Sequence, residues 1–223
     1  MMTKFSFDIV GFDLDGTLLD TSGDLAAAVN HALAAAGRPA LTVEQVRANT
    51  GGGVRHMLEL SMAPGGGCSE AEFNRLVALL LAYYEAHIAV ESRPFPGAIE
   101  AIDALQAGGV KIAIVTNKVE RLAVKLLDAL GLGDRFDLVI GGDTLGDGLA
   151  KPHRAPIDEM IRRCGGGRAA FVGDSRYDIA AAKNAGIPSI AVSFPPQPAE
   201  ELGANAVIHS YGELIPTLER LTV

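Results

Sequence analysis

Short runs of consecutive apolar residues recur along this chain, and longer amphipathic stretches separate them. Runs of this kind are typical of parallel strands buried on both faces, whereas the amphipathic stretches are typical of covering helices. The pattern predicts an α/β fold, a doubly wound parallel sheet with helices on both faces. The expected strands are residues 7–12, 111–116, 138–140, 169–172, 189–192 and, with a weaker pattern, 206–208.

Glycines mark the ends of three helices expected between these strands. The expected helices span residues 98–107, 119–130 and 177–185. Glycine follows each of them, at Gly108, Gly131 and Gly186. Because glycine readily adopts the left-handed conformation that favours a helix C-terminus, these positions support the three predicted helices.

The connection between the first two strands is far longer than a parallel crossover requires, which is about a dozen residues. Stretches with a helical pattern fill it, at residues 24–36, 43–48, 54–62 and 70–87. We therefore expect residues 22–93 to form a small all-helical insert, and residues 1–21 and 94–223 to form the sheet domain. The return segment, Ser-Arg-Pro-Phe-Pro-Gly at 92–97, has the proline and glycine content of a linker.

Composition narrows the classes of partner. The 223 residues include 19 Lys+Arg and 27 Asp+Glu, a net charge of −8, which argues against nucleic acid as the main partner because phosphate backbones bind basic faces. Cys68 and Cys164 lie far apart in the sequence and do not suggest a disulfide framework, so a cytoplasmic location is expected. The N-terminus lacks the features of a signal peptide, and the longest helical apolar run, 77–84, is shorter than the roughly 18 residues of a membrane span.

Polar residues follow three of the expected strands, at the edge where sheets of this type bind ligands. The residues are Asp13-Leu14-Asp15-Gly16-Thr17, Thr116-Asn117-Lys118, and Gly173-Asp174-Ser175 with the nearby Asp178. If strand geometry persists, Asp13 and Asp15 point to one side with Cα atoms roughly 6.5 Å apart. With Asp174 they would form an oxygen ligand set suited to Mg²⁺. On its own, Asp-x-Asp-Gly is also compatible with a turn that carries two solvated acids.

Four motifs occur in a fixed order, three of them at these strand ends and KP in the connection before the last: FDLDGTLLD, VTNK, KP and GDSRYD. In that order and in those positions, they resemble the haloacid dehalogenase superfamily over essentially the whole chain. The resemblance implies a Rossmann-like catalytic core with an inserted helical cap. It also implies hydrolysis of a small phosphorylated metabolite with Mg²⁺ as cofactor.

The resemblance further implies a role for each acidic motif residue. Asp13 would be the nucleophile that attacks phosphorus and forms an aspartyl-phosphate. Asp15 would protonate the leaving group and then activate water. Asp13, Asp174 and the backbone carbonyl of Asp15 would hold the metal.

The remaining motif residues would bind or balance the phosphoryl group. Thr116 and Asn117 would donate hydrogen bonds to phosphoryl oxygens, and Lys151 would offset the negative charge on the phosphate and on Asp13. From the residues alone, Thr116 and Asn117 also suit a helix N-cap, and Lys151 suits a solvated surface site. Asp178 suits either a supporting partner of the metal or of Lys151, or a cap at a helix start.

The segment 49–55 of the insert, Asn-Thr-Gly-Gly-Gly-Val-Arg, is the candidate substrate loop. In this superfamily a helical insert closes over the active site and excludes water. Gly52 would allow a close backbone approach, and Arg55, near a helix start, would contact an anionic substrate. The alternative is an ordinary interhelical loop with Arg55 in solvent.

Two longer segments narrow the resemblance to one branch. DTSGDLAAAVNHALAAAGRP and GDSRYDIAAAKNAGIPSIAV are most similar to bacterial phosphoglycolate phosphatases, which implies hydrolysis of 2-phosphoglycolate to glycolate and phosphate. Two departures concern substrate identity: Arg154 stands where these enzymes commonly have proline, and the glycine triplet at 51–53 is unusually rich.

Alternatives therefore remain open at this point. They are a pyrophosphatase, a sugar-phosphate phosphatase or a phosphomutase with the same cap, and a non-catalytic metabolite-binding protein on the same fold. The last is disfavoured because binding alone does not need a nucleophile such as Asp13. The sequence is compatible with a monomer or a homodimer.

Overall fold

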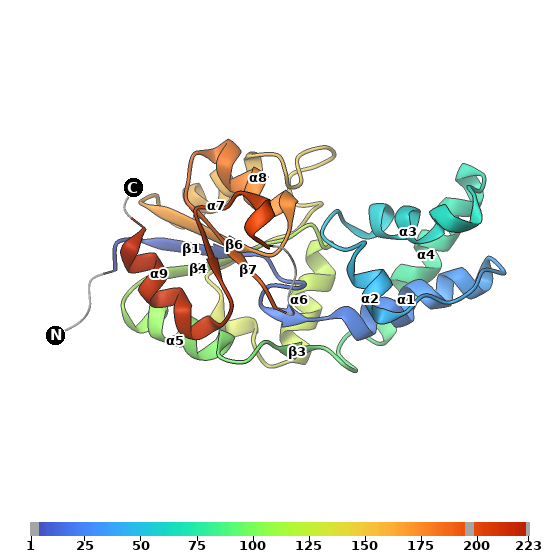
Figure 1. Ribbon diagram of the computed structural model, residues 1–223, viewed down its shortest axis with the longest axis horizontal. Coiled ribbons are helices and arrows are strands. Elements are labelled where there is room, and N and C mark those ends of the chain that lie inside the picture. Colours follow the sequence, from blue (N-terminus) through green and yellow to red (C-terminus); the bar gives the residue numbers. More distant parts are fainter. Residues whose placement is uncertain (1–4, 195–198, 222–223) are drawn as a thin grey trace.

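A parallel sheet of six strands forms the centre of one lobe of the molecule (Figure 1). The computed structural model describes residues 5–194 and 199–221. In the spatial order of the sheet, the strands are β5 (Leu138–Ile140), β4 (Lys111–Val115), β1 (Ile9–Phe12), β6 (Ala169–Gly173), β7 (Ser189–Val192) and β8 (Ala206–Ile208). Every neighbouring pair is parallel. The predicted doubly wound α/β fold is confirmed.

Helices cover both faces of this sheet, because successive strand residues point into opposite apolar layers. On one face, Ile9 of β1 belongs to a layer with Met160 of α7 (Ala155–Arg163) and Ala181 of α8 (Arg176–Ala185). The adjacent Val10 belongs to the opposite layer. The helices of that layer are α5 (Ala98–Ala107), α6 (Glu120–Ala129) and α9 (Leu214–Arg220).

The long connection after β1 forms a separate helical lobe, on the right in Figure 1. Its helices are α1 (Ser22–Ala35), α2 (Val43–Arg47), α3 (Val54–Met62) and α4 (Glu70–Ala86). These helices match the four helical patterns expected in the insert to within two residues at each end. Even α4, with 17 residues, is not long and apolar enough to cross a membrane, and neither is any other helix among the described residues.

Two chain segments join the lobes, and they are fastened to each other. β2 (Leu19–Asp20) and β3 (Arg93–Pro94) pair as a short antiparallel ribbon. Beside it, the buried carboxylate of Asp24 accepts hydrogen bonds from the backbone N–H groups of Glu91 and Ser92, at 3.0 Å and 2.9 Å, and from the Ser92 hydroxyl at 2.6 Å. The two linkers therefore meet at one place, next to the carboxyl end of β1.

Candidate active site

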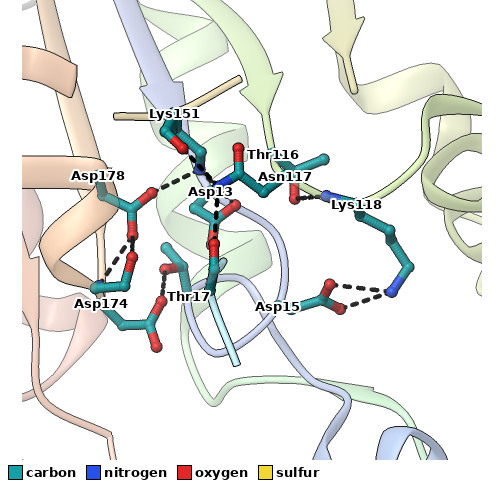
Figure 2. Close-up of polar contacts among 11 residues, drawn as sticks. Asp13, Asp15, Thr17, Thr116, Asn117, Lys118, Lys151, Asp174 and Asp178 are labelled. Atoms are coloured by element: carbon teal, nitrogen blue, oxygen red, sulfur yellow. Dashed lines mark hydrogen bonds and ion pairs between the residues drawn. The ribbon is translucent and has the colours of Figure 1, made fainter. Parts of the chain in front are cut away.

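The strand order brings the polar strand ends together at one edge of the sheet. From β1 the chain runs outward to β4 and β5, and it then returns to β6 on the other side of β1. The direction of winding therefore reverses between β1 and β6, and a crevice at such a reversal is the usual ligand site. Asp13 follows β1 and Asp174 follows β6, so the two carboxylates flank this position (Figure 2).

A buried lysine joins two carboxylates at the centre of the site. Lys151 comes from the loop between β5 and α7, and its Nζ lies 2.8 Å from Asp13 Oδ1 and 2.5 Å from Asp178 Oδ1. None of the three side chains is more than 5% exposed. Burial opposes the charged form, but the two carboxylates outweigh it and raise the pKa of Lys151. The alternative of a solvated surface lysine is therefore wrong.

Asp178 combines the two roles between which the sequence left a choice. Its Oδ2 accepts hydrogen bonds from the backbone N–H of Ser175 at 2.9 Å and from the Ser175 hydroxyl at 2.6 Å, which completes a capping box at the start of α8. Its Oδ1 pairs with Lys151. The helix start thus fixes the carboxylate that holds the lysine in place.

An acidic cluster surrounds this lysine. Carboxylate oxygens of Asp13, Asp174 and Asp178 lie within 4.8 Å of one another. Burial raises the pKa of Asp13 to about 6 against the opposing effect of Lys151, and burial together with the nearby carboxylates raises the pKa of Asp174 well above its ordinary value.

The charge of the cluster fits a divalent cation. Three carboxylates face one ammonium, so a doubly charged cation would balance the excess of negative charge. Both oxygens of Asp178 already accept hydrogen bonds. Asp13 and Asp174 are therefore the better-placed ligands. The Thr17 hydroxyl orients Asp174 by donating to its Oδ1 at 3.0 Å.

The Asp15 carboxylate does not converge on Asp13, contrary to the expectation from strand spacing. It points toward Lys118, whose Nζ lies 3.0 Å from both of its oxygens (Figure 2). Its Oδ1 also accepts a hydrogen bond from the Thr21 hydroxyl at 2.7 Å. The physical reason is that β1 ends at Phe12, so the alternation of strand side chains does not extend to this residue.

The residues after β4 connect the sheet to the insert. Thr116 is buried and its hydroxyl oxygen accepts the backbone N–H of Lys118 at 3.2 Å. The Asn117 side chain donates to the carbonyl oxygens of Gly51 at 2.8 Å and Lys151 at 2.9 Å. The N-cap residue of α6 is Val119, so neither Thr116 nor Asn117 caps this helix.

The loop at the start of α3 approaches the site through its glycines and not through Arg55. Gly51 accepts the hydrogen bond from Asn117, and a Cβ on Gly52 would collide with the ring of His56 and lie 3.0 Å from the Tyr177 hydroxyl. Arg55 is exposed, donates to Asn74 on α4 at 2.8 Å and lies over the ring of Phe73. Arg55 is not among the described residues that line the cavity.

A cavity that is open to solvent lies between the two lobes. Asp13, Asp15, Thr116 and Lys118 line it from the sheet side, whereas the helical lobe contributes mainly apolar side chains and Tyr84. No role was predicted from the sequence for Lys118 or Tyr84. Lys118 directly follows two motif residues, which is a signal that could have found it, but nothing in the sequence places Tyr84 opposite β4.

Comparisons with known proteins agree with this geometry. Residues 10–192 match the family model of the haloacid dehalogenase-like hydrolases. A phosphoglycolate phosphatase of Caulobacter vibrioides is 42% identical over 207 residues, 91% of this chain and 86% of that protein. One of Agrobacterium fabrum is 41% identical over 212 residues, 93% of this chain and 90% of that protein.

A solved structure supports the same assignment. The crystal structure of a predicted phosphoglycolate phosphatase from Haemophilus somnus superposes with a TM-score of 0.87 at 28% identity, and the match covers 97% of this chain and 99% of that chain. Family model, relatives and fold agree over nearly the whole length. The chain therefore belongs to the haloacid dehalogenase-like hydrolases.

Proposed function

We propose that this protein is a Mg²⁺-dependent phosphomonoester phosphatase whose substrate is 2-phosphoglycolate. The observation that carries the proposal is the buried Asp13, which is paired with Lys151. A carboxylate oxygen of Asp13 lies within 4.8 Å of one of Asp174, at the position where the winding of the sheet reverses. Two relatives more than 40% identical over nine-tenths of this chain are named phosphoglycolate phosphatase, and this supports the choice of ester.

The proposed reaction has two displacements at phosphorus. In the first, an Asp13 oxygen attacks phosphorus, the bond from phosphorus to the ester oxygen breaks, and Asp15 donates its proton to that oxygen, so glycolate leaves. In the second, water attacks the aspartyl-phosphate, Asp15 takes the proton of the water, and the bond from phosphorus to Asp13 breaks. Free phosphate results, Asp13 is again a carboxylate, and Asp15 again carries the proton that it donates in the first step.

The other polar groups hold reactants and offset charge. Lys151 fixes the nucleophile through its 2.8 Å contact with Asp13, and its ammonium offsets the negative charge of the phosphoryl group. Thr116 and Asn117 would contact phosphoryl oxygens. A Mg²⁺ held by Asp13, Asp174 and the carbonyl of Asp15 would supply further positive charge at the phosphoryl oxygens.

We also propose that residues 22–93 act as a cap over a catalytic core of residues 1–21 and 94–223. Gly51 already contacts the core by accepting a hydrogen bond from Asn117, and a Cβ added to Gly52 would lie 3.0 Å from the Tyr177 hydroxyl. Closure of the cap would exclude water from the reacting phosphorus. In this proposal the partner is a small phosphorylated metabolite, the protein acts in the cytoplasm, and it is a monomer or a homodimer.

Steady-state rates over a panel of esters test the proposal. The panel contains 2-phosphoglycolate, pyrophosphate and several sugar phosphates, each with Mg²⁺ and with EDTA, and it includes Asp13→Asn as the control for contaminating phosphatases. We expect the highest kcat/KM for 2-phosphoglycolate and loss of activity in EDTA. A clear preference for another ester would refute the substrate, and full activity without divalent cations would refute the metal requirement.

A further inference from the structure

Lys118 is the only cationic side chain among the described residues that line the cavity. Its side chain is 5% exposed, and it comes from the segment that follows β4. Its ammonium lies 3.0 Å from both oxygens of Asp15, and this ion pair is held inside the cavity. A buried cation that faces a ligand cavity is a strong candidate to recognise an anionic group.

The other cationic side chains near the site already form ion pairs or hydrogen bonds. Lys151 is held by both Asp13 and Asp178. Arg55 is exposed and donates to Asn74 on α4, and Arg47 contacts Asp20 and Ser22 beside the linkers. Within the described part of the chain, Lys118 thus supplies the one ammonium that lines the cavity and could meet a substrate carboxylate there.

A second polar group points to the same place. The hydroxyl of Tyr84, on α4, is buried, and the residue is only 2% exposed. It interacts with the Lys118 ammonium, but its own proton has no acceptor within hydrogen-bond distance in the described chain. Lys118 Nζ lies 4.3 Å from the centre of the Tyr84 ring, and burial raises the pKa of Tyr84, so the phenol keeps its proton. An unsatisfied buried donor beside a buried ammonium suits a ligand oxygen.

The present partner of Lys118 is itself a carboxylate. Lys118 Nζ contacts both oxygens of Asp15 at 3.0 Å. In this position the Asp15 carboxylate points toward Lys118 and is turned from Asp13 (Figure 2). A carboxylate from the substrate could replace that of Asp15 without leaving the ammonium unpaired, which keeps the charge balance around Lys118 unchanged.

We propose that Lys118 and the Tyr84 hydroxyl bind the carboxylate of the substrate, and that this exchange releases Asp15 to turn toward the ester oxygen. The inference rests on the proposed function and adds the basis of its specificity. Phosphate esters whose organic part carries no charge would leave Asp15 paired with Lys118, so they would react slowly. Phosphorylated small carboxylic acids are the substrate class that this arrangement selects.

The test compares two substrates that differ in the recognised group. These are 2-phosphoglycolate and 2-hydroxyethyl phosphate, in which a neutral hydroxymethyl group replaces the carboxylate. For Lys118→Met we expect the ratio of kcat/KM between the two to fall at least about 30-fold, since a buried, hydrogen-bonded charge pair loses one partner. For Tyr84→Phe, which keeps the Lys118–Asp15 pair, we expect a fall of about 5- to 10-fold. Lys183→Met, at an exposed position of α8, is the matched control.

The outcomes separate the two hypotheses. If both variants lower kcat/KM for the two substrates by the same factor, Lys118 only positions Asp15. The inference is then overturned, while the proposed function stands. If the wild-type protein hydrolyses other esters but not 2-phosphoglycolate, the proposed function fails and the inference fails with it. Inhibition by glycolate gives a readout without turnover, and it should weaken in Lys118→Met and Tyr84→Phe but not in Lys183→Met.

Discussion

Replacement of Lys151 with methionine tests how the buried charges at the site are balanced. Methionine fills a similar volume but leaves Asp13 and Asp178 without the ammonium that contacts both, at 2.8 Å and 2.5 Å. Since the three side chains are almost fully buried, water cannot take over this role. We expect the free energy of unfolding, measured without metal near pH 7.5, to fall by about 3–5 kcal/mol, as for other buried pairs that lose one partner.

The pH dependence of this loss has a defined sign. The pKa of Asp13 is about 6 in the folded protein, above the ordinary value of 3.8, and it should rise further once Lys151 is gone. The folded state then binds a proton more tightly than the unfolded state, so the lost stability should return as the pH falls from about 7.5 toward 5. Urea unfolding in EDTA at several pH values measures this recovery.

An exposed ion pair of similar length provides the control. Arg154 Nε lies 2.6 Å from Asp158 Oδ2, but both side chains are at least two-fifths exposed, and Arg154→Met should leave stability nearly unchanged because solvent screens the pair. A loss of less than about 1 kcal/mol for Lys151→Met, or a loss that does not depend on pH, would refute this explanation of the charge balance.

Two further predictions concern the metal. Burial raises the pKa of Asp13 to about 6 and that of Asp174 well above its usual range, so the metal-free protein should lose stability as the pH rises from about 4 to 6. The rise in Tm caused by Mg²⁺ should therefore be large near pH 7.5 and small near pH 5. An increase in Tm that is the same at both pH values would contradict this. Gly16→Ala should weaken Mg²⁺ affinity measured by calorimetry, because Gly16 has φ +83° and an added Cβ would collide with Asp174 Oδ2. Gly37→Ala is its control, with φ +65° and nothing within 4 Å of the added Cβ, and equal metal affinity in the two variants would count against the role of Asp174.

The sheet and most of the helices could be predicted from local pattern. A strand such as β4, buried on both faces, must be a continuous apolar run, and that signal survives in a single sequence. Two helices were not predicted. α7 carries a helical pattern that the prediction missed, because Ile157, Met160 and Ile161 recur at helical spacing and face one apolar layer. α9 has only seven residues with a proline inside, too few for a clear pattern. The ribbon of β2 and β3 has two residues in each strand, too short for any periodicity.

Part of the site could be predicted in the same way, and part could not. The motifs placed Asp13, Asp174 and Lys151 in one region because the carboxyl ends of neighbouring parallel strands meet there. The directions in which individual side chains point could not be predicted from sequence spacing. Asp15 turns to Lys118 because β1 ends before it, and Arg55 points to α4 because of how the insert packs. Tyr84 reaches Lys118 only through the packing of α4 across the lobe boundary.

The proposed mechanism depends above all on Asp13, which must carry the phosphoryl group between the two displacements. Asp15→Asn should slow hydrolysis of the aspartyl-phosphate, and p-nitrophenyl phosphate has a leaving group that needs no proton from Asp15, so this pair should accumulate the intermediate. Acid quenching followed by peptide mass spectrometry measures it. We expect one phosphoryl group on the peptide that contains Asp13, and none in a variant that also carries Asp13→Asn. Steady turnover with no phosphorylated peptide, or with the phosphoryl group on another residue, would show that Asp13 is not the nucleophile.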